Sequence, residues 1–164
     1  MNAPEFHNKR ALVTGGTKGI GESIVRLLAQ RGATVITSAR KAPANPLAGV
    51  RYLQADVATL EGANAVVDVI KREFGGLDLL VNNVGGLSAP TGGALALTDT
   101  DWKGPIQTNL MSAVTIDRAF LPRMVAQGSG AIVHITSIQR RFPLYESTVA
   151  YAAQKPCLQI TVNR

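Results

Sequence analysis

ALVTGGTKGIG, at residues 11–21, predicts a short buried strand that leads through a glycine-rich turn into a helix. An apolar stripe with helical spacing follows it, formed by Ile20, Ile24, Leu27 and Leu28. Glycines at positions 15, 19 and 21 allow a tight turn and a close approach of a ligand to the backbone, and a helix N-terminus attracts phosphate. The segment therefore predicts a dinucleotide-binding turn, with an ordinary strand-to-helix loop as the alternative.

The rest of the chain alternates predicted strands with predicted helices. Strands are expected near residues 10–14, 34–38, 50–54, 77–82 and 131–136, and helices near 20–31, 61–74, 98–126 and from about 149 onward. This alternation predicts an α/β fold, a doubly wound parallel sheet with helices on both faces. Pro43 and Pro46 predict a loop with little helix after the second strand, whereas Gly104-Pro105 and Pro156 are expected to interrupt helices.

A second motif lies near the C-terminal end of the chain. Tyr151 and Lys155 are four residues apart, so on a helix both side chains would lie on one face. An ammonium beside a phenol favours the phenolate and so makes tyrosine a usable acid/base near neutral pH. Ser137 would then hydrogen-bond the oxygen of a substrate carbonyl. Taken alone the pair could equally be solvated, because this spacing is common in helices.

The end of the second predicted strand indicates which dinucleotide is bound. Domains that prefer NAD usually carry an acidic residue there for the ribose 2′-hydroxyl, but this chain has Thr37-Ser-Ala-Arg40-Lys41. Arg40 can form bidentate contacts with a 2′-phosphate, and Lys18 in the glycine turn adds a second positive charge. The sequence therefore predicts NADP(H) as the cofactor.

Further signatures follow the glycine turn in a fixed order. They are Asp56-Val57, Asn82-Asn-Val-Gly85, Asn109, and the set Ser137, Tyr151 and Lys155, with thirteen residues between Ser137 and Tyr151. With Thr14-Gly-x-x-x-Gly-Ile-Gly21 they resemble the short-chain dehydrogenase/reductase family, in particular its NADP-preferring ketone and 3-oxoacyl reductases. The resemblance covers about Lys9 to Leu158 and implies a Rossmann-type sheet with strand order 3-2-1-4-5, in a single domain over residues 1–164.

The same resemblance implies the chemistry and the catalytic residues. Hydride would pass between NADP(H) and a carbonyl or hydroxyl group of a small-molecule substrate, with Tyr151 as acid/base. Lys155 would bind the nicotinamide ribose and assist Tyr151, Ser137 would hold the carbonyl, and Asn109 would anchor a water.

It also implies a set of cofactor-binding residues. Asp56 would hydrogen-bond the adenine, and Asn82 would line the same side of the site. The expected set is Gly15, Thr17, Lys18, Gly19, Ile20, Gly21, Arg40, Asp56, Val57, Asn82, Gly85, Tyr151 and Lys155.

Relatives in this family continue beyond the position that corresponds to Arg164, with two more strands and a substrate loop. We therefore interpret the chain as C-terminally truncated, and expect Ile132, Val133 and Ile135 to form an apolar sheet edge through which chains associate. The alternative to an active oxidoreductase is a truncated, catalytically weak or inactive dinucleotide-binding remnant. A further alternative is an acidic carrier-protein substrate, bound by Arg118, Arg123, Arg140 and Arg141.

Composition limits the remaining function classes. The chain has 164 residues, 46% of them hydrophobic, and its net charge of +6 comes from scattered basic residues without a basic run. We therefore expect no nucleic-acid partner. No apolar run suits a membrane helix and the first ten residues lack a signal segment, so we expect a cytoplasmic protein, a homo-oligomer when folded. Cys157 is the sole cysteine, and neither His7 nor His134 has clustered ligand partners, so we expect no metal.

Overall fold

The computed structural model describes residues 4–87 and 89–160. Its parallel sheet has the order β3-β2-β1-β4-β5. The strands are β1 (Arg10–Thr14), β2 (Thr34–Ala39), β3 (Arg51–Gln54), β4 (Leu79–Asn82) and β5 (Ala131–His134). The predicted α/β fold class and strand order are confirmed. In this order β2 and β3 lie on one side of β1, and β4 and β5 lie on the other side. The connections after β1 and β4 therefore lead to opposite sides, which places a crevice beyond the carboxyl ends of these two strands.

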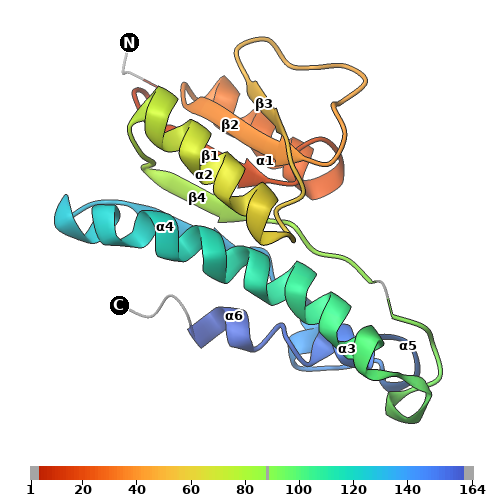
Figure 1. Cartoon of the computed structure of the whole chain (residues 1–164). Helices are drawn as coiled ribbons and strands as arrows, with labels where there is room; N and C mark the ends of the chain where they lie inside the picture. Colours follow the sequence, from red (N-terminus) through yellow and green to blue (C-terminus); the bar gives the residue numbers. More distant parts are fainter. Residues whose placement is uncertain (1–3, 88, 161–164) are drawn as a thin grey trace.

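Helices connect the strands and extend beyond the sheet (Figure 1). The helices are α1 (Gly19–Gln30), α2 (Leu60–Phe74), α3 (Asp99–Ile106), α4 (Ser112–Ala126), α5 (Tyr145–Ala152) and α6 (Cys157–Ile160). The described chain also contains the 3-10 turns η1 (Ala94–Ala96) and η3 (Ile138–Arg140) and the π-helical turn η2 (Gln107–Met111). Figure 1 shows the α3–η2–α4 rod extending past the sheet to α5 and α6.

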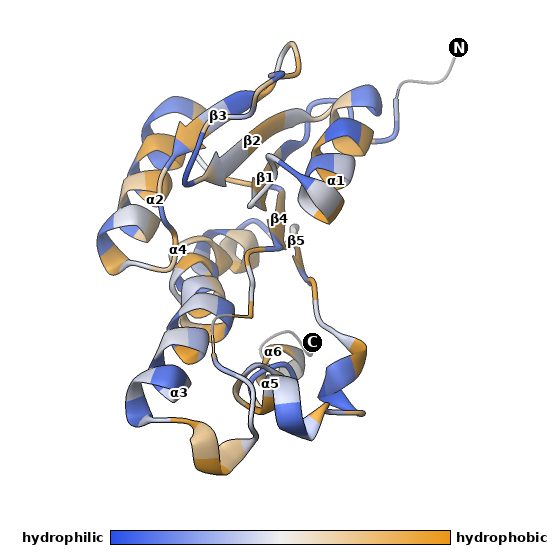
Figure 2. Cartoon of the chain, turned by 90° about the vertical axis from the view of Figure 1, so that its right-hand side faces the viewer, coloured by the Kyte–Doolittle hydropathy of each residue, from blue (hydrophilic) through white to orange (hydrophobic). Residues whose placement is uncertain are grey.

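Alternating side chains of the strands form an apolar core on each face of the sheet. Leu12, Ile36 and Leu80 pack on one face beneath α2 and α4. Val13 and Val35 pack on the other face beneath α1. Figure 2 shows that α1 and α2 each have a hydrophobic and a hydrophilic side, as expected for helices that cover a sheet. Strands buried on both faces are typical of a parallel sheet, which the alternation of strands and helices predicted.

Local sequence explains the form of the two connections on either side of β3. Residues 40–50, between β2 and β3, form no helix, as Pro43 and Pro46 predicted. Thr59 caps α2 by accepting a hydrogen bond from the N–H of Gly62, and Gly75 ends the helix in a left-handed conformation with φ of 70°.

The predicted helix over residues 98–126 is interrupted rather than regular. Pro105 lies inside α3, and the π-helical turn η2 separates α3 from α4. A π turn moves the backbone hydrogen bond from i−4 to i−5, which leaves an i−4 carbonyl for another donor. The side chain of Asn109 supplies that donor, because its Nδ2 lies 3.0 Å from the carbonyl oxygen of Pro105.

The helix predicted to carry both Tyr151 and Lys155 ends between them. α5 ends at Ala152, residues 153–156 form turns, and α6 begins at Cys157. The prediction that Tyr151 and Lys155 share one regular helix face was therefore wrong. Pro156 is the physical reason, since proline disfavours helical backbone at the preceding residue and donates no N–H.

The expected apolar edge at β5 is smaller than the sequence suggested. β5 pairs with β4, and no described strand pairs with its other edge. Ile132 packs against the core beneath α4, and Ile135 packs against the cluster on the α1 side. Val133 is 42% exposed and is the large apolar residue of the three that reaches the surface.

A buried polar cluster joins α4 to the last two strands. Asn82 Nδ2 donates to Asp117 Oδ1 at 2.7 Å, and His134 Nε2 lies 3.0 Å from Asp117 Oδ2. The His134 and Asp117 side chains are only 4% and 9% exposed. The Asn82–Asp117 hydrogen bond and the approach of His134 to the same carboxylate hold the ends of β4 and β5 against α4.

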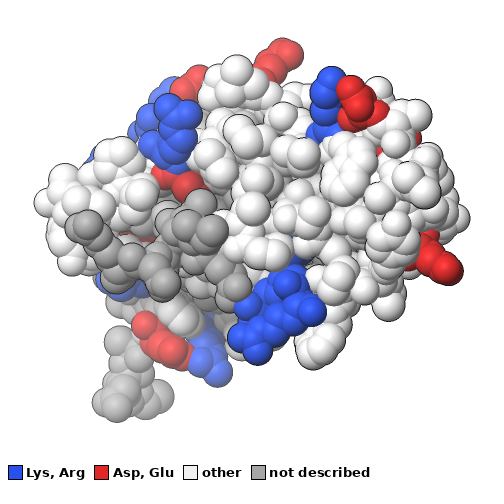
Figure 3. All heavy atoms as spheres, turned by 90° about the horizontal axis from the view of Figure 1, so that it is seen from below, with Lys and Arg blue, Asp and Glu red and all other residues white. Residues whose placement is uncertain are grey.

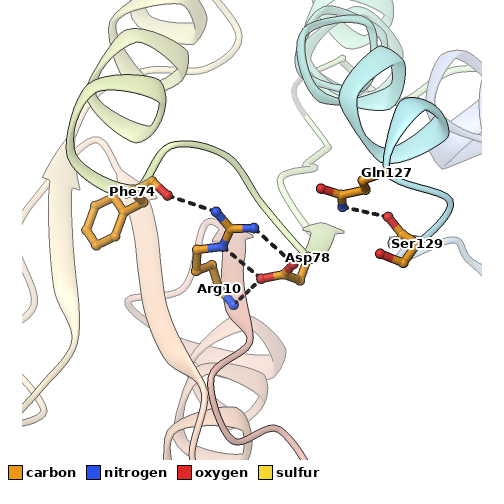
Figure 4. Close-up of polar contacts among 5 residues, drawn as sticks. All are labelled: Arg10, Phe74, Asp78, Gln127 and Ser129. Atoms are coloured by element: carbon orange, nitrogen blue, oxygen red, sulfur yellow. Dashed lines mark hydrogen bonds and ion pairs between the residues drawn. The ribbon is translucent and has the colours of Figure 1, made fainter.

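A second polar cluster closes the opposite, amino edge of the sheet (Figure 4). The Arg10 guanidinium donates to both carboxylate oxygens of Asp78 and to the carbonyl of Phe74. The backbone N–H of Arg10 also donates to Asp78, at 2.8 Å. These bonds hold the pKa of Asp78 below its ordinary value. They tie β1, the start of β4 and the end of α2 into one unit.

Candidate active site

A large cavity lies beyond the carboxyl ends of β1, β2 and β4, where the topology predicts a crevice. Its volume is about 1150 Å³, above the roughly 300–1,000 Å³ of ordinary small-molecule sites. The described residues that line it are Gly15, Thr17, Lys18, Gly19, Ile20, Gly21, Ser38, Ala39, Arg40, Lys41, Ala42, Pro43, Ala44, Ala55, Asp56, Val57, Ala58, Asn83, Val84, Gly85, Gly86, Leu87 and Thr108. A cavity of this size accommodates an extended ligand.

Two positions of the turn favour glycine, Gly21 because other atoms lie close to it and Gly15 because of its backbone conformation. A Cβ added to Gly21 would lie 2.3 Å from the carbonyl oxygen of Gly15 and 2.5 Å from Asn83 Nδ2. Gly15 itself has a φ of 70°, a conformation that glycine adopts without strain. The start of α1 therefore packs directly on the turn, and its first three residues line the cavity.

Asn83 and Thr14 fix the glycine turn to the end of β4. Asn83 Nδ2 donates to the carbonyls of Thr14 and Gly15, at 2.9 and 3.2 Å. Thr14 Oγ1 accepts the backbone N–H groups of Asn83 and Val84, at 2.9 and 3.1 Å. Thr14 is buried, so these bonds are protected from water.

The chemistry of the cavity fits a phosphate-bearing dinucleotide. Lys18, Arg40 and Lys41 line it, whereas Asp56 is the one acidic residue among the described lining residues. Ser38 Oγ is buried at the lining and has no hydrogen-bond partner among the described residues, so it is available to a ligand. A Cβ built on Gly19 would meet no atom within 4 Å, so the space above the turn is open.

Asn109 lies beside the cavity and is nearly fully buried. Its Oδ1 accepts the N–H of Gly86 at 3.0 Å, and its Nδ2 donates to the carbonyl of Gly86 at 3.1 Å. A Cβ on Gly85 would lie 2.8 Å from Asn109 Oδ1 and 3.4 Å from Lys155 Nζ. Gly85 lines the cavity, so Asn109 and Lys155 both lie immediately behind its wall.

Lys155 and Tyr151 are in contact although the helix ends between them. The ammonium of Lys155 lies 4.9 Å from the centroid of the Tyr151 ring, a cation–π contact. Lys155 is 3% exposed, and Nζ donates to the carbonyl of Ile135 at 3.4 Å. Burial lowers the pKa of Lys155 below its ordinary value, because the charged form loses its hydration.

Ser137 reaches the same region through β5. It lies two residues beyond Ile135, whose carbonyl accepts from Lys155, so an extended chain separates the two positions by at most about 7 Å. Its Oγ accepts the N–H of Gln139 at 3.2 Å and thereby begins the turn η3. The hydroxyl hydrogen remains available as a donor.

Most, but not all, of the expected cofactor-binding residues line the cavity. Tyr151 and Lys155 lie outside its lining, and Asn82 does too, because its side chain is directed into the core toward Asp117. Asn83, the next residue of the motif, lies at the wall instead. Sequence reasoning missed Ser38 and Lys41 as lining residues, although both lie in the stretch that indicated NADP(H).

Two other kinds of site were sought in residues 4–87 and 89–160. No three His, Cys, Asp or Glu side chains there come together as a group able to hold a metal ion. None of the helices in the same ranges combines the length and the apolar character needed to cross a membrane.

The fold and the site together define a dinucleotide-binding α/β protein, and comparison with known sequences identifies its family. The family model of the short chain dehydrogenases matches residues 9–162, so the chain belongs to that family. It is 33% identical to "Uncharacterized oxidoreductase YvrD" of Bacillus subtilis (strain 168), over 98% of this chain and 62% of that protein. It is 32% identical to "Uncharacterized oxidoreductase SAR2567" of Staphylococcus aureus (strain MRSA252), over 90% of this chain and 66% of that protein. The chain therefore spans just under two thirds of the length of these curated relatives.

Solved structures show the same similarity. The NADH-dependent reductase A1-R′ has a TM-score of 0.86 at 27% identity, covering 96% of this chain and 70% of the other. L-Sorbose reductase from Gluconobacter frateurii, complexed with NADPH and L-sorbose, has a TM-score of 0.84 at 32% identity, covering 98% and 64%.

Proposed function

We propose that this protein is an NADP(H)-dependent oxidoreductase that interconverts a carbonyl compound and the corresponding alcohol. The observation that carries the proposal is the contact between buried Lys155 and Tyr151, behind the cavity wall at Gly85. An ammonium, a phenol and an amide at the end of a dinucleotide-sized cavity are suited to moving a proton to or from a substrate oxygen.

Each residue has a role that its position supports. Tyr151 donates a proton to the carbonyl oxygen in the reducing direction and accepts it in the oxidising direction. Lys155 stabilises the phenolate by its charge, and Ser137 orients the carbonyl with its hydroxyl hydrogen. Asn109 holds the cavity wall at Gly86 in place through its two hydrogen bonds with the backbone of that residue. The bound dinucleotide supplies or accepts the hydride.

The residues of the cavity support NADP(H) over NAD(H). Arg40, Lys41 and Lys18 line the cavity, and no carboxylate lies at the end of β2 to repel a 2′-phosphate. The solved relatives include a protein described as NADH-dependent and one complexed with NADPH, so the family itself allows either cofactor. The local charge is the argument for NADP(H).

Tyr151→Phe tests the proposed chemistry because it removes only the hydroxyl. We expect NADPH binding, measured by calorimetry, to remain, and turnover of ketones, followed by NADPH absorbance, to fall by at least ~10²-fold. Tyr145→Phe, which removes the hydroxyl of an exposed tyrosine at the start of the same helix, is the control. Near-normal turnover in the Tyr151 variant would refute the proposed role of Tyr151.

A further inference from the structure

The segment between β5 and α5 carries two arginines that no internal acid neutralises. Arg140 is half-buried and Arg141 is exposed, and neither forms an ion pair with a described residue. Glu146 is the only carboxylate in the sequence between Ser137 and Ile160, and its side chain makes no ion pair within the described chain either. The positive charge of this segment is therefore free to meet a ligand.

Exposed apolar side chains lie in the same segment and in the loop after β4. They are Leu87, Leu95, Ile138, Phe142 and Leu144. The loop after β4 meets the start of α5, because the N–H groups of Gly92 and Gly93 both donate to the carbonyl of Glu146. Figure 2 shows hydrophobic and hydrophilic stretches side by side in the segment from β5 to α5. Figure 3, a view from below, shows that basic and acidic side chains form separate small groups on a largely uncharged surface.

Arg140 is held close to Ser137 by local structure. The N–H of Arg140 donates to the carbonyl of Ser137 at 3.2 Å, within the 3-10 turn η3. Such a turn rises about 2 Å per residue, so the backbone of Arg140 lies about 6 Å along the turn from Ser137. An extended arginine side chain is longer than this distance. A group bound at Ser137 is therefore within its reach.

The structure separates these arginines from the other two that an acidic carrier protein was expected to use. Arg123 lies against Gly76, which precedes β4 at the amino edge of the sheet. Ser137 and Arg140 follow β5 at the carboxyl edge. Arg118 and Arg123 lie on α4, whereas Arg140 and Arg141 lie in the loop after β5. The four arginines do not form one docking surface, which favours a small ligand over a protein.

We propose that the substrate is an apolar carbonyl compound that bears a carboxylate, and that Arg140 binds this carboxylate while Ser137 holds the carbonyl. A guanidinium pairs with a carboxylate through two parallel hydrogen bonds, and the exposed apolar side chains of the same segment offer contacts to the apolar part of such a compound. This proposal names the substrate class of the proposed oxidoreductase and rests on that function. Reduction adds a hydride to the keto carbon and a proton to its oxygen, and leaves the carboxylate unchanged.

A pair of substrates that differ only in charge tests the proposal. The probes are 4-phenyl-2-oxobutanoate and its methyl ester, assayed with NADPH and the full 164-residue chain. We expect Arg140→Gln to raise KM for the acid at least ~10-fold and to leave KM for the ester within about twofold. Arg140→Lys should recover part of the loss, since it keeps the charge but not the planar fork.

Arg141→Gln is the matched control, because it removes the same charge one residue away. It should change KM for both substrates less than about threefold. Equal effects of the two variants, or equal effects of Arg140→Gln on acid and ester, would overturn the proposal. So would a loss in both variants confined to an acyl thioester carried on an acidic protein, since that result indicates protein docking.

A binding measurement separates this proposal from the proposed oxidoreductase function. Calorimetric titration of 4-phenylbutanoate, which has no ketone, into the chain with NADP⁺ reports the carboxylate site without turnover. Binding that weakens at least ~10-fold in Arg140→Gln supports the carboxylate site even if the chain reduces no ketone. If the ester is reduced and the carboxylate binds equally to both chains, the oxidoreductase function stands and the substrate class is wrong.

Discussion

Lys155 is the residue where stability and proposed function conflict most directly. Its side chain lies in the interior at 3% exposure, in contact with Tyr151 and with the carbonyl of Ile135. Burial of an ammonium is unfavourable unless other groups replace its hydration, and here one carbonyl and one aromatic ring do so. The lowered pKa of Lys155 reports the part of the hydration that is not replaced.

Lys155→Met should therefore stabilise the chain at neutral pH while reducing its turnover by at least ~10²-fold. The folded pKa of Lys155 is lowered. Between that folded pKa and the unfolded value of 10.5, the unfolded chain therefore holds more protons than the folded chain. The natural chain gains stability over this window, so the advantage of the variant should shrink there. Urea unfolding at several pH values measures the difference, and an advantage that grew with pH would contradict the account.

Arg40 is the residue expected to set the cofactor preference. The natural chain should bind NADPH at least ~10-fold more tightly than NADH, a difference of about 1.4 kcal/mol. Arg40→Ala should remove most of that difference by weakening NADPH alone. Lys71→Ala, which removes an exposed positive charge from α2, should leave it unchanged. Fluorescence titration of the three chains with both dinucleotides measures these affinities, and equal affinities in the natural chain would refute the expected preference.

At the scale of the elements, the Arg10–Asp78 cluster joins β1, β4 and α2, and its contribution to stability should depend on pH. Asp78 receives hydrogen bonds from the side chain and backbone of Arg10, and these lower its pKa. A lowered carboxyl pKa contributes stability above the unfolded value, near 3.8, and that stability is lost as pH falls through the folded pKa.

Asp78→Asn should lower the free energy of unfolding by about 1–3 kcal/mol at pH 7. The difference from the natural chain should narrow as the pH falls below the unfolded value near 3.8 and through the lowered folded pKa, where Asp78 of the natural chain becomes protonated. Glu73→Gln, at the exposed pair with Arg51, is the control and should change stability much less than Asp78→Asn does. Denaturant unfolding at pH 7 and pH 3 gives both values, and a pH-independent difference for Asp78→Asn would contradict the prediction.

Element order, strand positions and the glycine turn could be predicted because local pattern determines them. Buried apolar runs, glycines at positive φ and the prolines at 43 and 46 act on their own neighbours. The break in the helix between Tyr151 and Lys155 could not be located from the sequence. Pro156 predicted an interruption, but the sequence does not show where one helix ends and the next begins. Asn82 and Asn83 are adjacent, and only the packing of α4 decides that Asn82 is directed to Asp117 while Asn83 holds the glycine turn.

At the scale of the whole molecule, we expect copies of the chain to associate at the outer edge of β5. In the described part of the chain this edge has no neighbouring strand, and Val133 on the same strand is 42% exposed. An unpaired apolar edge can pair with the same edge of another copy.

Val133→Lys should reduce association of the chain, because lysine on a strand edge opposes pairing between sheets. Light scattering over a range of protein concentrations should show a mass that rises for the natural chain and stays flatter for the variant. Leu27→Lys, which alters an exposed apolar residue on α1, should behave as the natural chain does. If the natural chain shows one constant mass, or if both variants dissociate it equally, β5 is not the associating edge.

The buried cluster of Asn82, Asp117 and His134 restricts the order in which this sequence can change over evolutionary time. Loss of His134 first leaves the Asp117 carboxylate buried without the neighbouring imidazole, and loss of Asp117 first leaves Asn82 without its acceptor. Either single change exposes a desolvated polar group to an apolar interior, whereas replacing the set together with apolar residues need not. Lineages should therefore keep all three residues or exchange them nearly together, so these positions would covary across related sequences although they lie on three different elements.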